Sequence, residues 1–408
     1  MVEKKRSLTK EDGKFLTALA VLALFYILRY FEHVISQYNT TLFAMSYKYG
    51  FISRGMIGTI WLGLDTLLPV NLMTYEAVYW FTVGMTLVYF LMFFGFYKAV
   101  LERVEESKVR NIRYMIVFLS IFVFPEFLGD EMFGRLDLYL FILTMVCVIL
   151  LMKEKGEWWI LPICLLCVCI HQGFVFTNIN IILVLLFYKM MTSEGKKQKK
   201  YIGIFVITLT GVSVLFLYFE LFSHSQGAEI YKEIVTLAKS LSEDGKSYNE
   251  SIINHEILGK DVFEDEILMH QDNYHEFPIS LLLWSPYIIM GCGFLWKMIH
   301  REKGKTFWAY LAVIAGGLTI VPEMILKVDY GRYFFLLFFY YVLVVLCLYV
   351  FGDKKVKGLI NVLKEWLKKN IPVPYVVLAY PMFLMPFFDV LISPAVYKLS
   401  VWIFGEVL

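Results

Sequence analysis

Long apolar runs constrain this chain more than any other feature of its sequence. A helix rises about 1.5 Å per residue and the hydrocarbon core of a bilayer is roughly 30 Å thick, so about 20 apolar residues can cross it. We therefore predict an all-α, polytopic integral membrane protein with about 11 transmembrane helices. The predicted spans are 14–32, 76–97, 113–128, 136–152, 157–173, 176–191, 201–222, 278–298, 306–324, 332–351 and 374–392.

The composition excludes most other classes of protein. Of the 408 residues, 59% are hydrophobic and only 18% are charged, whereas an ordinary soluble chain carries about 25% charged residues. A single soluble core stops growing at about 250–300 residues and cannot hide such an apolar excess. A soluble enzyme, a disordered chain, a fibrous repeat and a secreted disulfide scaffold are therefore excluded. The net charge of +2 gives no reason to expect a nucleic-acid partner.

A further apolar stretch, 55–73, differs from the other runs because it contains three glycines, Asp65 and Pro69. Glycine and proline both weaken a helix interior. We interpret this stretch as a re-entrant or interfacial helix, and a full span is the competing interpretation.

The distribution of basic residues predicts the orientation. With the N-terminus in the cytoplasm, 27 of the 38 Lys and Arg residues fall in inner segments and 10 in outer ones. Cytoplasmic loops are enriched in Lys and Arg, so we expect a multi-pass protein of the cell membrane with a cytoplasmic N-terminus. We treat 1–408 as a single transmembrane domain. Its outer loop, 223–276, is interpreted as a lid, and 355–370 as an amphipathic helix on the cytoplasmic surface.

The turn at 125–137 holds the densest group of charges within apolar sequence. Carboxylates held close together in a low-dielectric pocket have raised pKa values, which a general base needs. We therefore interpret Glu126, Asp130 and Glu131 as candidate catalytic residues. In the alternative interpretation the turn is solvated, its acids cap the next helix, and Glu131 pairs with Arg135 four positions later.

A second polar turn begins at His171. The apolar stretches before the two turns, Arg113 to Pro125 and Trp158 to Ile170, are each about 13 residues or roughly 20 Å long. Both turns would start below the outer surface, so we predict a recessed polar cavity that opens outward. His171 is our fourth candidate catalytic residue, as a proton carrier or a donor to phosphate. Its alternative role is to cap a helix or to satisfy a buried carbonyl.

Two arginines lie beside glycines near the outer ends of predicted helices: Arg54 precedes Gly55, and Arg332 follows Gly331. Arginine binds phosphate bidentately where the backbone can approach closely, so we predict a phosphate-binding role for both. Snorkelling of the two side chains to lipid headgroups explains them equally well. The predicted substrate-binding set also includes Arg135, Asp137, Glu323 and Asp329.

All six cysteines lie inside predicted spans, where small apolar residues pack between helices. Cys164, Cys167 and Cys169 have a spacing seen in metal sites, but a thiolate in lipid needs a cation and polar neighbours that this run lacks. We therefore predict no structural disulfide and no cofactor; a divalent metal is compatible with the sequence, but no residue pattern supports one.

The outward-facing set of carboxylates, arginines and one histidine resembles the multi-pass, lipid-carrier-dependent glycosyltransferases. These include the bacterial polysaccharide polymerases and O-antigen ligases, with a GT-C-like fold. The resemblance covers topology and the placement of polar residues, and no diagnostic motif. It implies an outer cavity that receives a polyprenyl-phosphate-linked sugar and a saccharide acceptor. Basic residues would bind the phosphate, and an acid or histidine would activate the acceptor hydroxyl.

Two other functions are compatible with the same residues. The first is a transporter or flippase of a lipid-linked sugar or small solute, a class in which discontinuous helices and inverted repeats are common. The second is an outer-face polysaccharide acyltransferase, in which His171 would be the base.

Overall fold

The structure is a computed structural model that describes residues 10, 13–18, 20–21, 34–101, 133–222, 228–258, 276–326 and 330–384. Within these ranges every regular element is a helix, which confirms the all-α prediction.

In the part of the chain that the structure describes, six helical segments are long and apolar enough to cross a membrane, and each coincides with a predicted span. Four of them are single helices: α4 (Tyr75–Leu101), α10 (Gly195–Phe222), α14 (Glu276–Ile299) and α17 (Tyr330–Phe351). The remaining two are interrupted: α8 (Phe174–Thr177) with α9 (Ile179–Thr192), and α15 (Gly304–Gly317) with η4 (Leu318–Ile320) and α16 (Val321–Leu326).

The predicted number of about 11 spans is not confirmed. Two predicted spans form helices that are shorter than the six spanning segments. Span 136–152 forms α6 (Asp137–Lys153), and span 157–173 forms η3 (Glu157–Trp159) followed by α7 (Ile160–Ile170). The predicted spans 14–32, 113–128 and 374–392 lie wholly or partly outside the described residues. In the last of them, α19 (Val373–Leu384) is described.

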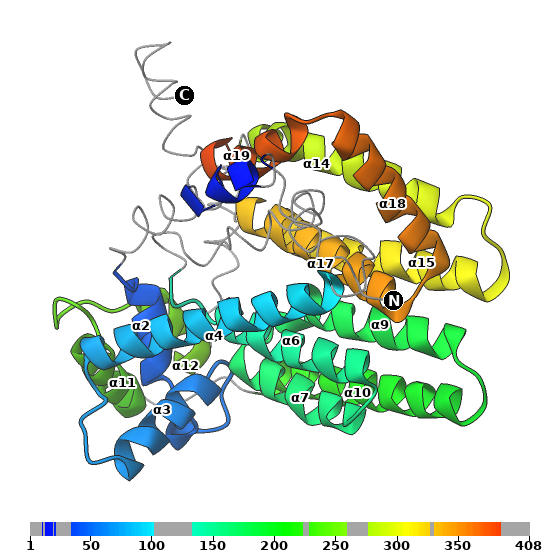
Figure 1. The fold of residues 1–408 in the computed structure, drawn as a ribbon. Helices are drawn as coiled ribbons and strands as arrows, with labels where there is room; N and C mark the ends of the chain where they lie inside the picture. Colours follow the sequence, from blue (N-terminus) through cyan, green and yellow to red (C-terminus); the bar gives the residue numbers. More distant parts are fainter. Residues whose placement is uncertain are drawn as a thin grey trace.

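Helix α17 lies at the centre of the fold. In its apolar stretch 78% of the residues are buried inside the protein, against 22% for the apolar stretch of α10. In Figure 1, α17 runs between a group formed by α14, α15 and α18 and a second group formed by α4, α6 and α9. After Arg332, the α17 side chains are apolar or aromatic on every face, as expected for a helix surrounded by other helices.

The stretch 55–73 forms α3 (Met56–Leu67), a helix of 12 residues. Its length of about 18 Å cannot cross a bilayer, which favours a re-entrant or interfacial helix over a full span. Helix α3 crosses the end of α2 (Gln37–Ala44) so closely that a Cβ at Gly58 would lie 1.9 Å from the carbonyl oxygen of Met45. Only glycine fits this crossing.

Two helices of the segment 228–258 pack against α2 at the same end of the molecule (Figure 1). The first is α11 (Ala228–Ser240), whose apolar face buries Ile234 and Ala238. The second helix is α12 (Glu250–Leu258). Lys48, in η1 (Tyr47–Tyr49), forms an ion pair with Glu233 of α11. Helices α11 and α12 are therefore an integral part of the fold around α2.

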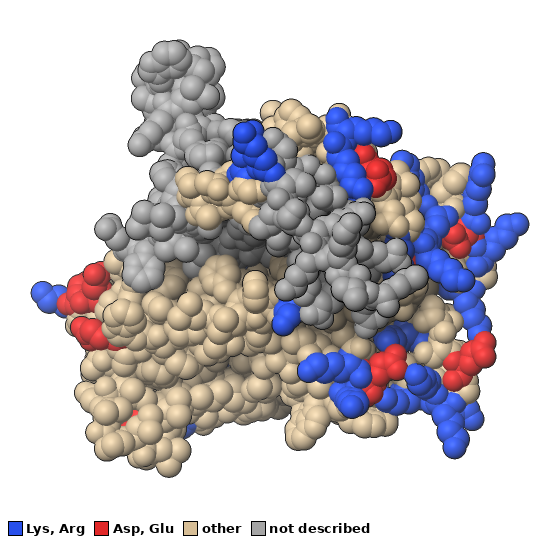
Figure 2. Space-filling model, in the orientation of Figure 1, with Lys and Arg blue, Asp and Glu red and all other residues tan. Residues whose placement is uncertain are grey.

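Lys and Arg gather at the opposite end of the molecule. Figure 2 shows this basic end on the right, over the α9–α10 and α14–α15 connections and α18. The predicted surface helix at 355–370 forms α18 (Lys354–Lys369), with Val356, Ile360 and Leu367 buried and lysines between them. Asp353 accepts hydrogen bonds from Tyr188 and Tyr310, at 2.8 Å each, and from the backbone N–H of Val356, so it ties α9 and α15 to the start of α18.

The interruptions in α8–α9 and α15–α16 lie next to each other. The Nδ2 of Asn180 donates to Thr319 Oγ1 (2.6 Å) and to the carbonyl of Phe176 (3.1 Å). Tyr340 and Tyr341 of α17 donate to the carbonyls of Val313 and Ile314 near the end of α15. An interrupted helix leaves backbone carbonyl groups without hydrogen-bond partners inside a bilayer, and these side chains supply such partners.

Candidate functional site

Arg54 lies in the loop between η1 and α3 and has an unusual backbone. Its φ is 59°, in the left-handed region that residues with a Cβ seldom adopt. Such a conformation costs on the order of 1–3 kcal/mol and persists only where the surroundings determine it. Its side chain is 13% exposed, which contradicts snorkelling to the headgroups. The loop therefore turns the guanidinium into the protein.

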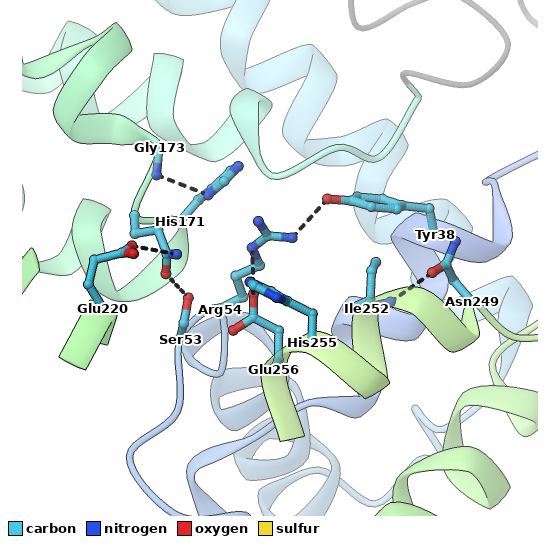
Figure 3. Close-up of polar contacts among 11 residues, drawn as sticks. Tyr38, Ser53, Arg54, His171, Gly173, Glu220, Asn249, Ile252, His255 and Glu256 are labelled. Atoms are coloured by element: carbon cyan, nitrogen blue, oxygen red, sulfur yellow. Dashed lines mark hydrogen bonds and ion pairs between the residues drawn. The ribbon is translucent and has the colours of Figure 1, made fainter. Parts of the chain in front are cut away.

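Two partners hold this guanidinium (Figure 3). Its Nη1 donates to the hydroxyl of Tyr38 at 2.9 Å. Its Nε lies 3.2 Å from Oε1 of Glu256, whose side chain is 0% exposed. Burial and the nearby charge of Arg332 lower the pKa of Arg54, but Tyr38 and Glu256 outweigh them and the net pKa is raised. Arg54 is therefore a buried cation.

Glu256 was not among the sequence predictions. It lies on α12 beside His255, whose Nε2 is 4.0 Å from Oε1 of Glu256. A signal for it exists in the sequence, because Ile252, Ile253 and Ile257 share one face of a helix with position 256. All three isoleucines are buried. A glutamate on an apolar helix face has to find a buried partner, and that partner is Arg54.

Two further arginines of the predicted substrate-binding set, Arg135 and Arg332, interact with Tyr38 or with Arg54. The guanidinium carbon of Arg135 lies 5.7 Å from the centre of the Tyr38 ring, and Tyr38 also accepts the hydrogen bond from Arg54. Arg332 lies near enough for its charge to act on Arg54. These residues come from positions before α3, at the start of α6 and at the start of α17.

The predicted site residue Glu323 also belongs to this region. Nη2 of Arg332 donates to the hydroxyl of Tyr333 (2.8 Å), which donates to Oε2 of Glu323 at 3.4 Å. Tyr333 thus links the first turn of α17 to α16. Tyr333 thereby joins Glu323 to Arg332, and the role of Glu323 in binding substrate stays a prediction.

His171 forms the predicted turn. Helix α7 ends at Ile170, and Nδ1 of His171 accepts the backbone N–H of Gly173 at 3.2 Å. The neutral imidazole therefore carries its proton on Nε2, a tautomer inferred from this hydrogen bond. In this state the ring is a donor at Nε2, which fits a donor to phosphate better than a base.

A chain of polar side chains joins the His171 turn to the Arg54 loop. Ser53, next to Arg54, donates to Oε1 of Gln172. The amide nitrogen of Gln172 donates to Glu220 of α10 at 2.9 Å. The loop before α3 is thereby fixed to the turn after α7; in Figure 3 the side chains of His171 and Arg54 both lie to the right of this connection.

Several of the remaining predicted site residues lie outside the part of the chain that the structure describes. Glu126, Asp130, Glu131 and Asp329 lie outside the described residues, so their catalytic and binding roles stay predictions, as does the recessed cavity between the two turns. Asp137 is the first residue of α6. A carboxylate there interacts favourably with the N-terminal amides of the helix, and its role in substrate binding stays a prediction.

The described residues contain no group of three or more His, Cys, Asp and Glu side chains arranged to hold a metal. Cys292 is exposed and the other five cysteines are buried, none of them in a disulfide.

No family model, no curated protein and no solved structure matches this chain.

Proposed function

We propose that this protein is a membrane glycosyltransferase or polysaccharide polymerase that uses a polyprenyl-phosphate-linked sugar. The observation that supports the proposal is that Arg54 and Arg135 both contact Tyr38, with the charge of Arg332 acting on Arg54. Guanidinium groups bind the oxygens of a phosphate in bidentate pairs, so arginines that lie close together can share one phosphate or diphosphate.

The reaction is an inverting transfer. The acceptor hydroxyl attacks the anomeric carbon, and the bond from that carbon to the phosphate oxygen breaks with its electron pair on the phosphate. Arg54, Arg135 and Arg332 stabilise the charge that develops on this leaving group. His171 donates a hydrogen bond from Nε2, and Glu126, Asp130 or Glu131 takes the proton of the acceptor hydroxyl. The chain's own residues thus provide a phosphate site, a donor and a base.

We also propose that the basic end of the molecule faces the cytoplasm of a cell. The Lys-rich helix α18 lies at this end, and cytoplasmic segments are enriched in Lys and Arg. The arginine site at the other end then faces outward. The lipid-linked sugar and the saccharide acceptor meet there, and the N-terminus is cytoplasmic.

A transporter or flippase of a lipid-linked sugar is the second candidate. The observation in its favour is the contact between two interrupted helices, at Asn180 and Thr319. Transporters of several folds build their substrate sites at such interruptions. The third candidate, an acyltransferase, needs His171 as a base at Nε2, and the hydrogen bond at Nδ1 favours a donor there.

A transfer assay separates these functions. The protein is purified into nanodiscs with a polyprenyl-phosphate carrier that bears a labelled sugar, and a saccharide acceptor is added. A glycosyltransferase moves label to the acceptor and releases the free carrier, and Arg54→Gln lowers this rate. Label that only changes sides in proteoliposomes, without chemical transfer, supports the flippase. Label transfer that is unchanged when Arg54, Arg135 and Arg332 are all replaced by Gln contradicts the proposed site.

A further inference from the structure

We propose that Glu256 is a positioning residue, which fixes the guanidinium of Arg54 so that its remaining N–H groups face the phosphate of the lipid substrate. This inference rests on the proposed function. It brings a residue of the outer loop into the site, and it assigns a role to the one fully buried carboxylate that contacts Arg54 in the described part of the chain.

The contacts of Arg54 leave part of its guanidinium available. A guanidinium has five N–H groups. Nε forms an ion pair with Oε1 of Glu256 at 3.2 Å without a hydrogen bond, and one N–H of Nη1 donates to Tyr38 at 2.9 Å. The remaining N–H groups are on Nη1 and Nη2. Figure 3 shows this edge of the guanidinium directed to the space between Tyr38 and His171, on the side away from Glu256.

The backbone and the carboxylate fix the two ends of the Arg54 side chain. The left-handed φ of 59° sets the direction in which the side chain leaves the loop. Glu256 then holds the Nε end. A long arginine side chain has several rotatable bonds, and their ordering opposes binding unless the free protein has already fixed them. Glu256 supplies this ordering before the substrate arrives.

Helix α12, which carries Glu256, is fixed firmly to α2. Asn249 caps its start, accepting the N–H of Ile252 at 3.0 Å, and the N–H of Asn249 donates to Thr41 of α2 at 2.9 Å. Ile252, Ile253 and Ile257 are buried on the same face as Glu256. In the alternative role, Glu256 would occupy the phosphate position in the free protein and leave when the substrate binds. That role would need α12 to separate readily from α2. The anchoring of α12 favours positioning over competition.

Positioning of Arg54 and competition with the phosphate predict opposite changes in the affinity for a phosphate ligand when Glu256 is replaced. The probe is farnesyl phosphate, with farnesol as the uncharged reference, and the dissociation constant is measured on the full chain in nanodiscs. If Glu256 positions Arg54, Glu256→Gln weakens farnesyl phosphate binding roughly tenfold to a hundredfold, the effect of a misplaced binding group. Glu256→Asp recovers part of the affinity. Glu250→Gln, an exposed glutamate on the same helix, leaves it unchanged.

A double variant tests whether Glu256 acts through Arg54. In an Arg54→Gln background the further change Glu256→Gln is expected to have no additional effect, because the group that it positions is gone. A loss of stability alone would add to the effect of Arg54→Gln. Thermal unfolding of each variant, with and without farnesyl phosphate, shows whether it is folded, and Glu256→Asp provides the readout if Glu256→Gln is not.

The outcomes distinguish the inference from the proposed function. Tighter or unchanged binding by Glu256→Gln, or additive losses in the double variant, overturns the positioning role while the phosphate site stands. If the wild-type protein binds farnesyl phosphate no better than farnesol, the phosphate site itself is wrong, and the positioning role falls with it.

Discussion

Nε of Arg54 and Oε1 of Glu256 lie 3.2 Å apart in a buried ion pair that joins the loop before α3 to α12. The pair connects two segments that are far apart in the sequence and that both pack on α2. Removing one partner of a buried pair leaves an uncompensated charge, and this costs far more than the net value of the pair. Helix α12 and the loop that carries Arg54 are thus one structural unit.

The crossing of α2 and α3 is expected to be intolerant of any side chain. Gly58→Ala places a Cβ against the backbone oxygen of Met45, at 1.9 Å before relaxation. Since backbone has to move, we expect a loss of about 3 kcal/mol or more. The matched control is Gly63→Ala on the same helix, which meets nothing within 4 Å and is expected to gain about 0.5–1 kcal/mol. Thermal unfolding in detergent measures both. Equal stability of the two variants would refute the close crossing.

The all-helical membrane architecture could be predicted from the sequence, because apolar runs and interrupting glycines are local properties. The end of α7 at His171 and the short helix α3 follow from the same reasoning. The approach of Arg54 to Arg135 and Arg332 could be proposed only from their shared outer position. The partner of Arg54 was missed, since the sequence does not show which buried cation a glutamate on an apolar helix face will meet.

Asp353 is expected to stabilise the basic end of the bundle. Asp353→Ala removes the acceptor for Tyr188 and Tyr310, both buried, and the cap of α18. A lost cap costs about 1 kcal/mol, and a buried donor without a partner costs about 1–3 kcal/mol. We therefore expect a drop of roughly 3 kcal/mol in unfolding free energy. Lys354→Ala, at the exposed next position, is the control and should have little effect. Similar unfolding temperatures for the two variants would contradict this role.

The ion pairs of Glu154 predict a pH-dependent contribution to stability. Hydrogen bonds from Lys189 and Lys197 lower the pKa of Glu154 to about 2. A carboxylate with a depressed pKa stabilises the fold above its unfolded-state pKa of about 4.3 and loses that contribution as the pH falls through the folded value. Glu154→Gln should therefore unfold at a lower temperature than wild type at pH 7. The difference should shrink between about pH 4 and pH 2. A gap that persists unchanged at pH 2 argues against these ion pairs.

The orientation predicts opposite labelling of two surface positions. In a cysteine-free background, Glu243→Cys, between α11 and α12, should react with a membrane-impermeant maleimide added to intact cells. Lys303→Cys, in the α14–α15 connection, should react only after the membrane is opened. Both side chains are exposed, so differences in reactivity report sidedness. The reverse pattern would place the arginine site in the cytoplasm.

The position of the substrate phosphate tests the central claim most directly. A cryo-EM map of the protein in nanodiscs with a polyprenyl-phosphate-linked sugar would locate that phosphate. We predict phosphate density within hydrogen-bond distance, about 2.7–3.2 Å, of the available guanidinium nitrogens of Arg54, with Arg135 and Arg332 around it. Density for the phosphate at the basic end beside α18, with the arginine site filled only by protein, would contradict the claim.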